Sequence, residues 1–128
     1  MFSMPDDNSF EMLYDNLRAQ ETISFWSTSF IRGVTLDNAI VLVDEFSNLN
    51  FHELDSMITR VGEDSKIMFC GDITQSDLTR ENDKSGISDF IRILEEMKEF
   101  SCIEFDINDI VRSGLVKSYL LSKYNLGF

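Results

Sequence analysis

The stretch that decides the fold is AIVLVDE, residues 39–45. Its first five residues form an uninterrupted apolar run rich in β-branched side chains, and polar residues bound the run on both sides. Such a run is typical of a short strand that is covered on both faces, as strands of parallel sheets are. An antiparallel strand with one face in water would instead alternate apolar and polar residues. We therefore expect a strand of a buried parallel sheet over residues 39–43.

The segments that follow this run alternate between helix and strand patterns. Asn50 and Glu53 have the spacing of a capping box, and apolar residues at helical spacing continue to Gly62, which predicts a helix of about eleven residues. The remaining patterns predict a strand over residues 67–70, a helix over 87–97, a third strand over Cys102–Ile107 and a closing helix after Gly114. This alternation implies right-handed βαβ crossovers and a parallel α/β sheet.

The N-terminal part of the chain adds a helix and a strand to this series. We expect a helix from about Ser9 to Ala19 behind Asn8, then a strand over Ile23–Trp26 and a loop over residues 27–38. No repeat or linker pattern interrupts the chain, so residues 1–128 are predicted to form one unit. The sequence further predicts that Trp26 and the phenylalanines lie in the core, that Cys70 and Cys102 are buried reduced thiols, and that His52 lies on a helix surface.

Composition excludes several classes of protein. Of the 128 residues 43% are hydrophobic, which suits a folded core rather than a disordered chain. A net charge of −12 with scattered basic residues disfavours a stand-alone nucleic-acid binder. Because the sequence has neither a membrane-span pattern nor a secretory signal at its start, we expect a cytoplasmic protein without membrane contact.

Acidic residues follow the central strand at the point where parallel sheets bind their ligands. Asp44 and Glu45 after four apolar residues match the Walker B pattern. In that pattern Asp44 would hold the water shell of Mg²⁺, and Glu45 would orient or deprotonate an attacking water. Taken alone the pair is better explained as the solvated end of a strand in an acidic protein.

The next predicted strand also ends in polar residues, in the segment GDITQ, residues 71–75. Thr74 and Gln75 carry groups that position water or sense a terminal phosphate without adding charge. The alternative is a turn in which Asp72 caps the following segment. Two adjacent strands directing polar groups at one crevice favour a ligand site.

These motifs and their surroundings resemble the PhoH family of P-loop ATPases, which are akin to the first motor domain of superfamily 1 helicases. The resemblance extends from about Phe25 to Tyr124, and the segment after Asn48 is similar to sequences from the bacteriophage branch of the family. Five segments carry it, namely SFIRGVTL (29–36), IVLVDEFSN (40–48), TRVG (59–62), GDITQSDL (71–78) and DIVRS (109–113). It implies a RecA-like P-loop NTPase fold, ATP and Mg²⁺ as ligands, a homo-oligomeric ring and RNA as partners, and a location in the host cytoplasm if the protein is phage-encoded.

The resemblance also assigns roles residue by residue. They are Mg²⁺ binding for Asp44, water activation for Glu45, γ-phosphate sensing by the element that contains Asp72 and Gln75, and a phosphate contact for Arg112, often at a subunit boundary. Within the same element the residues expected to bind the nucleotide are Asp72 and, by its hydroxyl group, Thr74. For Arg112 an ion pair at the start of a helix is the alternative. The sequence departs from the family at Ser47, where a Gln is usual. Ser47 is too short for the coupling role of that Gln, and the neighbouring Asn48 is able to take over part of it.

A larger departure is that the chain has no Gly-x-x-x-x-Gly-Lys-[Ser/Thr] motif. We therefore expect the C-terminal portion of an ATPase domain, inactive alone, whose P-loop lies on an N-terminal segment. The incomplete fold would lack the P-loop strand between the strand ending at Cys70 and the one near Phe105. Truncation, a split protein and a partial gene remain open as its origin. The alternative functions are a non-catalytic acidic interaction module that retains the fold and a decoy that mimics nucleic acid by its charge.

Overall fold

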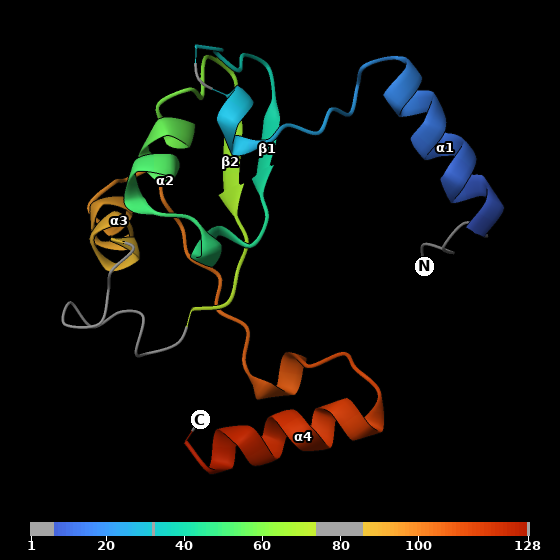
Figure 1. Cartoon of the computed structure of the whole chain (residues 1–128), viewed down its shortest axis with the longest axis vertical. Coiled ribbons are helices and arrows are strands. Elements are labelled where there is room, and N and C mark those ends of the chain that lie inside the picture. The colour runs from blue at the N-terminus through green and yellow to red at the C-terminus, as the bar shows by residue number, and fades with distance from the viewer. Residues whose placement is uncertain (1–6, 32, 74–85, 128) are drawn as a thin grey trace. The chain divides into compact units, whose positions relative to one another are not determined.

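The fold comes from a computed structural model, which describes residues 7–31, 33–73 and 86–127. By its internal contacts the chain divides into two units, Met1–Arg92 and Ile93–Phe128. The elements in chain order are α1 (Asp7–Ala19), η1 (Thr28–Phe30), β1 (Ile40–Val43), η2 (Phe46–Asn48), α2 (Phe51–Ile58), β2 (Lys66–Phe69), α3 (Ile87–Glu95), η3 (Ile107–Asp109) and α4 (Gly114–Asn125) (Figure 1). The η elements are single turns of 3₁₀ helix.

The centre of the first unit is a parallel pair of strands joined by a helix. β1 and β2 run in register from Ile40 opposite Lys66 to Val43 opposite Phe69. A parallel bridge between Leu36 and Val61 lies outside the two strands. The predicted order of strand, helix and strand is confirmed, and the mixed helices and small parallel sheet agree with the α/β class.

One face of this sheet is covered by α2 and the first turns of α3. Leu54 of α2 is fully buried, and Phe90 of α3 is 2% exposed. The ring of Phe90 meets those of Phe69 and Phe51 edge-on, with centroids 5.2 and 6.3 Å apart. Edge-to-face pairs at this spacing stabilise a core beyond the area that they bury. This aromatic cluster therefore ties β2 to both helices.

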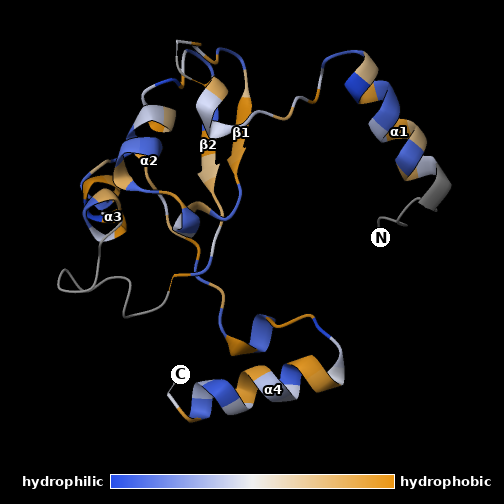
Figure 2. Cartoon of the chain, viewed as in Figure 1, coloured by the Kyte–Doolittle hydropathy of each residue, from blue (hydrophilic) through white to orange (hydrophobic). Residues whose placement is uncertain are grey.

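The other face of the sheet stays exposed, which makes the prediction of a strand buried on both faces wrong. Ile40 and Leu42 are 71% and 64% exposed, and Met68 beside them is 47% exposed. Figure 2 shows β1, and β2 after its first residue, in hydrophobic colours. Successive side chains of a strand point to opposite faces of the sheet. The described helices cover the face of Val41 and Val43, so only these two residues of β1 are sheltered.

Two predicted strands do not form. Residues 23–26 and 102–107 have no strand pairing, and Ile107 begins the 3₁₀ turn η3. The side chains of Phe25, Trp26, Ile103 and Phe105 are mostly exposed. A β-prone segment becomes a strand only where a neighbour satisfies its backbone groups, and no described segment does so here.

Several predictions about buried residues are also wrong, because no described segment covers these side chains. Trp26 is exposed rather than buried, whereas Phe46 and Phe90 do lie in the core. Cys70 and Cys102 are free thiols on the surface instead of buried ones. Among the described residues the exposed phenylalanines are Phe10, Phe25, Phe30 and Phe105.

The helices agree with their predicted positions, with differences at the ends. The capping box of α2 is confirmed, because Asn50 Oδ1 accepts from the Glu53 amide and Glu53 Oε2 accepts from the Asn50 amide, both at 3.0 Å. α2 ends at Ile58 rather than near Gly62, since the chain turns there toward the Leu36 bridge. His52 lies exposed on α2, as predicted.

The remaining helices differ only in where they start or stop. α1 begins at Asp7, so Asn8 lies inside that helix, and α3 ends at Glu95. α4 begins at Gly114, one residue earlier than expected. Among the described residues no helix combines the length and apolar character that a membrane span needs.

Candidate functional site

The candidate site begins at the turn that follows β1. Glu45 has a left-handed backbone, with φ 52° and ψ 39°, and the 3₁₀ turn η2 begins at the next residue. For a residue with a Cβ this conformation costs about 1–2 kcal/mol, so surrounding contacts must hold it. Because Glu21, Asn38 and Asp64 also have positive φ, the conformation matters here through the side chains that the turn positions.

Three hydrogen bonds within the turn hold Glu45 in place. Its amide donates to Asp44 Oδ1 at 2.9 Å, and its carbonyl oxygen accepts from the Asn48 amide at 2.9 Å. The carboxamide of Asn48 donates through Nδ2 to Glu45 Oε2 at 3.0 Å. Both the backbone and the carboxylate of Glu45 are therefore fixed by their immediate neighbours.

The turn is also anchored to the end of β2. Phe46, the residue after Glu45, donates its amide to the Cys70 carbonyl at 3.1 Å, and its ring is buried against Phe69. A Cβ at Gly71 would approach the Phe46 ring to 2.8 Å, so only glycine allows the two strand ends to lie this close. The structure thus brings Asp44, Glu45 and the Gly71–Asp72 segment to the same end of the sheet.

Three other residues predicted for the site, namely Thr74, Gln75 and Arg112, are not part of the described surroundings of this turn. Thr74 and Gln75 lie outside the described residues. Arg112 belongs to the second unit, where it is exposed in the segment between η3 and α4.

The ion pair that is the alternative role for Arg112 does not form among the described residues of the second unit. Asp106 and Asp109 instead cap η3, because Asp106 Oδ1 accepts from the Asn108 amide and Asp109 Oδ2 accepts from the Asp106 amide, both at 2.7 Å. Charge-assisted bonds to backbone amides occupy these carboxylates. The Arg112 side chain therefore stays in water in the described part of this unit.

The residues at this end of the sheet could bind Mg²⁺ only together with a phosphate ligand. The described residues contain no group of three or more His, Cys, Asp or Glu side chains placed to hold a metal. Mg²⁺ rarely needs such a cage, since it keeps several waters and binds through one or two carboxylates together with phosphate oxygens. Asp44 is exposed and uses Oδ1 for the Glu45 amide, which leaves Oδ2 for such an ion. Asp44 thus suits Mg²⁺ bound to a phosphate ligand.

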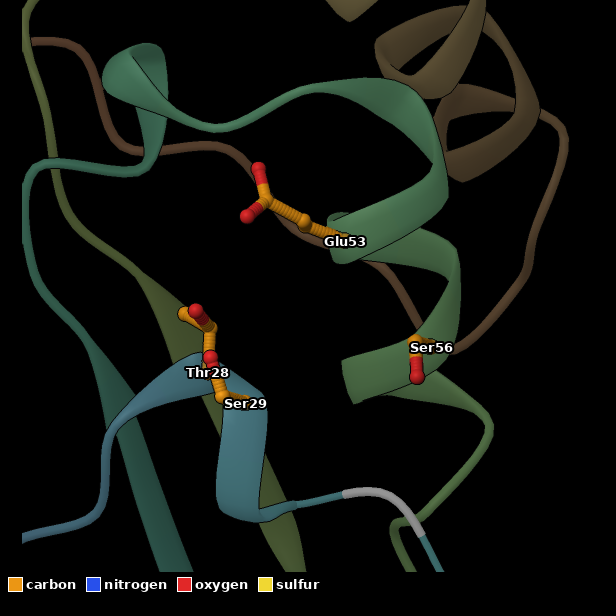
Figure 3. A pocket seen from close by; sticks show the side chains of 4 residues that line it. All are labelled: Thr28, Ser29, Glu53 and Ser56. Atoms are coloured by element: carbon orange, nitrogen blue, oxygen red, sulfur yellow. The ribbon is translucent and has the colours of Figure 1, made fainter.

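A separate polar hollow lies between η1 and α2. It has a volume of about 180 Å³ and is lined by Thr28 and Ser29 of η1 and by Glu53 and Ser56 of α2 (Figure 3). None of the predicted site residues lines it. Its three hydroxyl residues follow no sequence pattern, and Glu53 was recognisable only as a capping residue.

Comparison with known proteins points to one family. The family model described as PhoH-like protein matches residues 6–124. Protein PhoH of Escherichia coli (strain K12) is 37% identical over 92 residues, which are 72% of this chain and 26% of that protein. The PhoH-like protein of Bacillus subtilis (strain 168) is 34% identical over 115 residues, covering 84% of this chain and 36% of that protein.

A further relative gives the same result. The PhoH-like protein of Synechocystis sp. is 38% identical over 89 residues, covering 70% of this chain and 27% of that protein. The chain therefore spans about a quarter to a third of the length of the curated relatives that it matches. None of these three comes from a bacteriophage, so the phage origin stays a prediction.

Proposed function

The chain belongs to the PhoH-like family, and on that premise we propose that it carries the metal-binding and water-activating part of an ATPase site. One observation supports this proposal above the others. The Asp44–Glu45 turn holds a glutamate in a strained conformation and is bonded to the end of the neighbouring parallel strand. Adjacent carboxyl ends of parallel strands are where open α/β sheets bind their ligands.

In this proposal each residue acts on ATP bound with Mg²⁺. Asp44 holds the ion, which neutralises phosphate charge when it is bound. Glu45 accepts a proton from the attacking water or orients it. Asp72 and Gln75 belong to the element that senses the γ-phosphate, as the family resemblance implies, and the Thr74 hydroxyl is a further group able to contact the nucleotide. Arg112 meets a phosphate of its own or of a neighbouring subunit.

The phosphate cradle must come from another segment, because this sequence lacks the P-loop. An N-terminal P-loop-bearing segment would complete a RecA-like fold, of which this chain is the C-terminal portion. Among the described residues β2 pairs with β1 alone, which leaves its outer edge available to a further strand. A homo-oligomeric ring, RNA as a partner and a cytoplasmic location remain part of the proposal through the family resemblance.

A non-catalytic acidic interaction module is the competing function. The exposed apolar side chains of Ile40, Leu42 and Met68 favour it, since apolar surface of this kind marks interaction sites. In that case the assembled protein would bind its partner and hydrolyse no ATP.

The isolated chain is expected to bind ATP·Mg²⁺ weakly, with a dissociation constant of about 1 mM or higher. The reason is that Asp44 offers a ligand for the ion while nothing in the sequence cradles the phosphates. Isothermal titration calorimetry measures this directly. Low micromolar binding with hydrolysis above the blank would show that the chain contains a substitute cradle.

The Arg112→Ala variant is expected to lower turnover in the assembled enzyme on the order of a hundredfold, because a guanidinium stabilises charge on the transferring phosphate. Thermal stability should change little, since Arg112 is exposed and has no ion pair in the described part of its unit. Lys123→Ala, an exposed cation on α4, is the matched control. Equal turnover in the two variants would remove Arg112 from the site.

A further inference from the structure

We propose that Asn48 is the positioning residue of Glu45, with a side-chain amide that holds the carboxylate in the orientation needed for water activation. The inference rests on the proposed function and adds to it a residue that takes no part in metal or phosphate binding. It starts from the contact between Asn48 Nδ2 and Glu45 Oε2, which are 3.0 Å apart.

The local backbone explains why residue 48 reaches residue 45. Phe46–Asn48 form one turn of 3₁₀ helix, and its closing bond joins the Asn48 amide to the Glu45 carbonyl at 2.9 Å. A bond between residues i and i+3 returns the chain on itself, so it brings residue 48 back beside residue 45. Glu45 and Asn48 are thus bonded twice, through the backbone and through their side chains.

The neighbouring residue does not offer this contact. Ser47 stands where the family resemblance leads one to expect Gln, and its hydroxyl makes no hydrogen bond among the described residues. The backbone bond that closes the turn joins residues 45 and 48, so it does not bring Ser47 beside Glu45. The side chain that fixes the glutamate is therefore the next one along.

The chemistry of the amide suits a base. Asn is neutral and donates one bond to Oε2, whereas Lys or Arg would bring a positive charge that stabilises the carboxylate and makes it a poorer proton acceptor. Among the described residues nothing bonds to Oε1 of Glu45, so that oxygen remains for a water molecule. An amide at position 48 thus orients the carboxylate and leaves it able to accept a proton.

The first test needs only this chain. The three-bond Hα–Hβ couplings of Glu45, measured by NMR, should show one dominant rotamer in the wild type. They should average in Asn48→Ala and stay unchanged in the control Ser47→Ala. Averaged couplings in the wild type, or couplings unaffected by Asn48→Ala, would overturn the inference.

The second test uses the chain assembled with its P-loop-bearing segment. Loss of a hydrogen bond to a charged group corresponds to roughly a tenfold to hundredfold effect, so Asn48→Ala should lower kcat by about that factor and change KM by less than about threefold. Asn48→Asp keeps the shape but removes the donor and adds a negative charge, so it should be at least as damaging. Ser47→Ala should match the wild type.

The outcomes separate the inference from the function beneath it. A kcat for Asn48→Asp equal to that of the wild type would refute the positioning role alone. A wild-type assembly without ATPase activity would refute the proposed function and, with it, any hydrolytic role of Asn48.

Discussion

Replacing Glu45 by Gln is expected to lower ATP hydrolysis by about a thousandfold in the assembled site while ATP·Mg²⁺ still binds. The substitution keeps the size of the side chain and removes its charge and its ability to accept a proton. Binding persists because it depends on the P-loop of the partner segment and on Asp44. Phosphate release measures the loss of turnover, and calorimetry with ATP·Mg²⁺ measures the retained affinity.

Glu21→Gln is the matched control for this experiment. Glu21 is an exposed glutamate with a similar left-handed backbone, φ 56°, and it lies outside the candidate site. It separates the role of the Glu45 carboxylate from any effect of changing a glutamate in this conformation. Turnover that is indifferent to Glu45→Gln would make the Walker B assignment wrong. Loss of binding together with turnover would mean that Glu45 helps to hold the ion.

Phe90→Ala is expected to lower the free energy of unfolding by roughly 3–5 kcal/mol. Phe90 is 2% exposed, and its ring contacts those of Phe69 in β2 and Phe51 in α2. Its removal leaves a cavity in the cluster that joins the sheet to both helices. Because whole domains are stable by only about 5–15 kcal/mol, the variant should be partly unfolded at ambient temperature.

The matched control for this prediction is Phe30→Ala, since Phe30 is 73% exposed. That variant should stay within about 0.5 kcal/mol of the wild type. Urea denaturation followed by circular dichroism measures both. Equal midpoints for the two variants would show that the aromatic cluster does not hold the sheet together.

The features that could be predicted from the sequence are those in which the decisive contacts are local. The capping box of α2 depends on two residues three apart, Asn50 and Glu53, and both side chains bond as predicted. The parallel pairing of β1 and β2 follows from two apolar runs joined by a helix, a connection that leaves few alternatives.

The features that failed depend on distant partners. Residues 23–26 and 102–107 have the composition of strands, but a strand also needs a neighbour to bond with, and composition does not supply one. The apolar run of β1 predicts burial on both faces, whereas the described packing shelters one. The surface positions of Cys70 and Cys102 follow from the same absence of a covering layer in the described residues.

At the candidate site the sequence predicted which residues to consider but did not predict their geometry. Asp44 and Glu45 could be singled out as candidates because the Walker B pattern is contiguous. The left-handed backbone of Glu45 was not, since glutamate is a poor indicator of that conformation. The bond to Asn48 follows from this turn and becomes apparent only once the 3₁₀ geometry is known.

The left-handed glutamate has a consequence for how position 45 should evolve. Gly, Asn or Asp would adopt φ 52° at lower cost, so drift under selection for folding alone would replace Glu45. Where function depends on the carboxylate, selection must therefore remove those replacements continually. In a library randomised at this codon, clones chosen for solubility should be enriched in glycine, and clones chosen for hydrolysis by the assembled protein should return to glutamate.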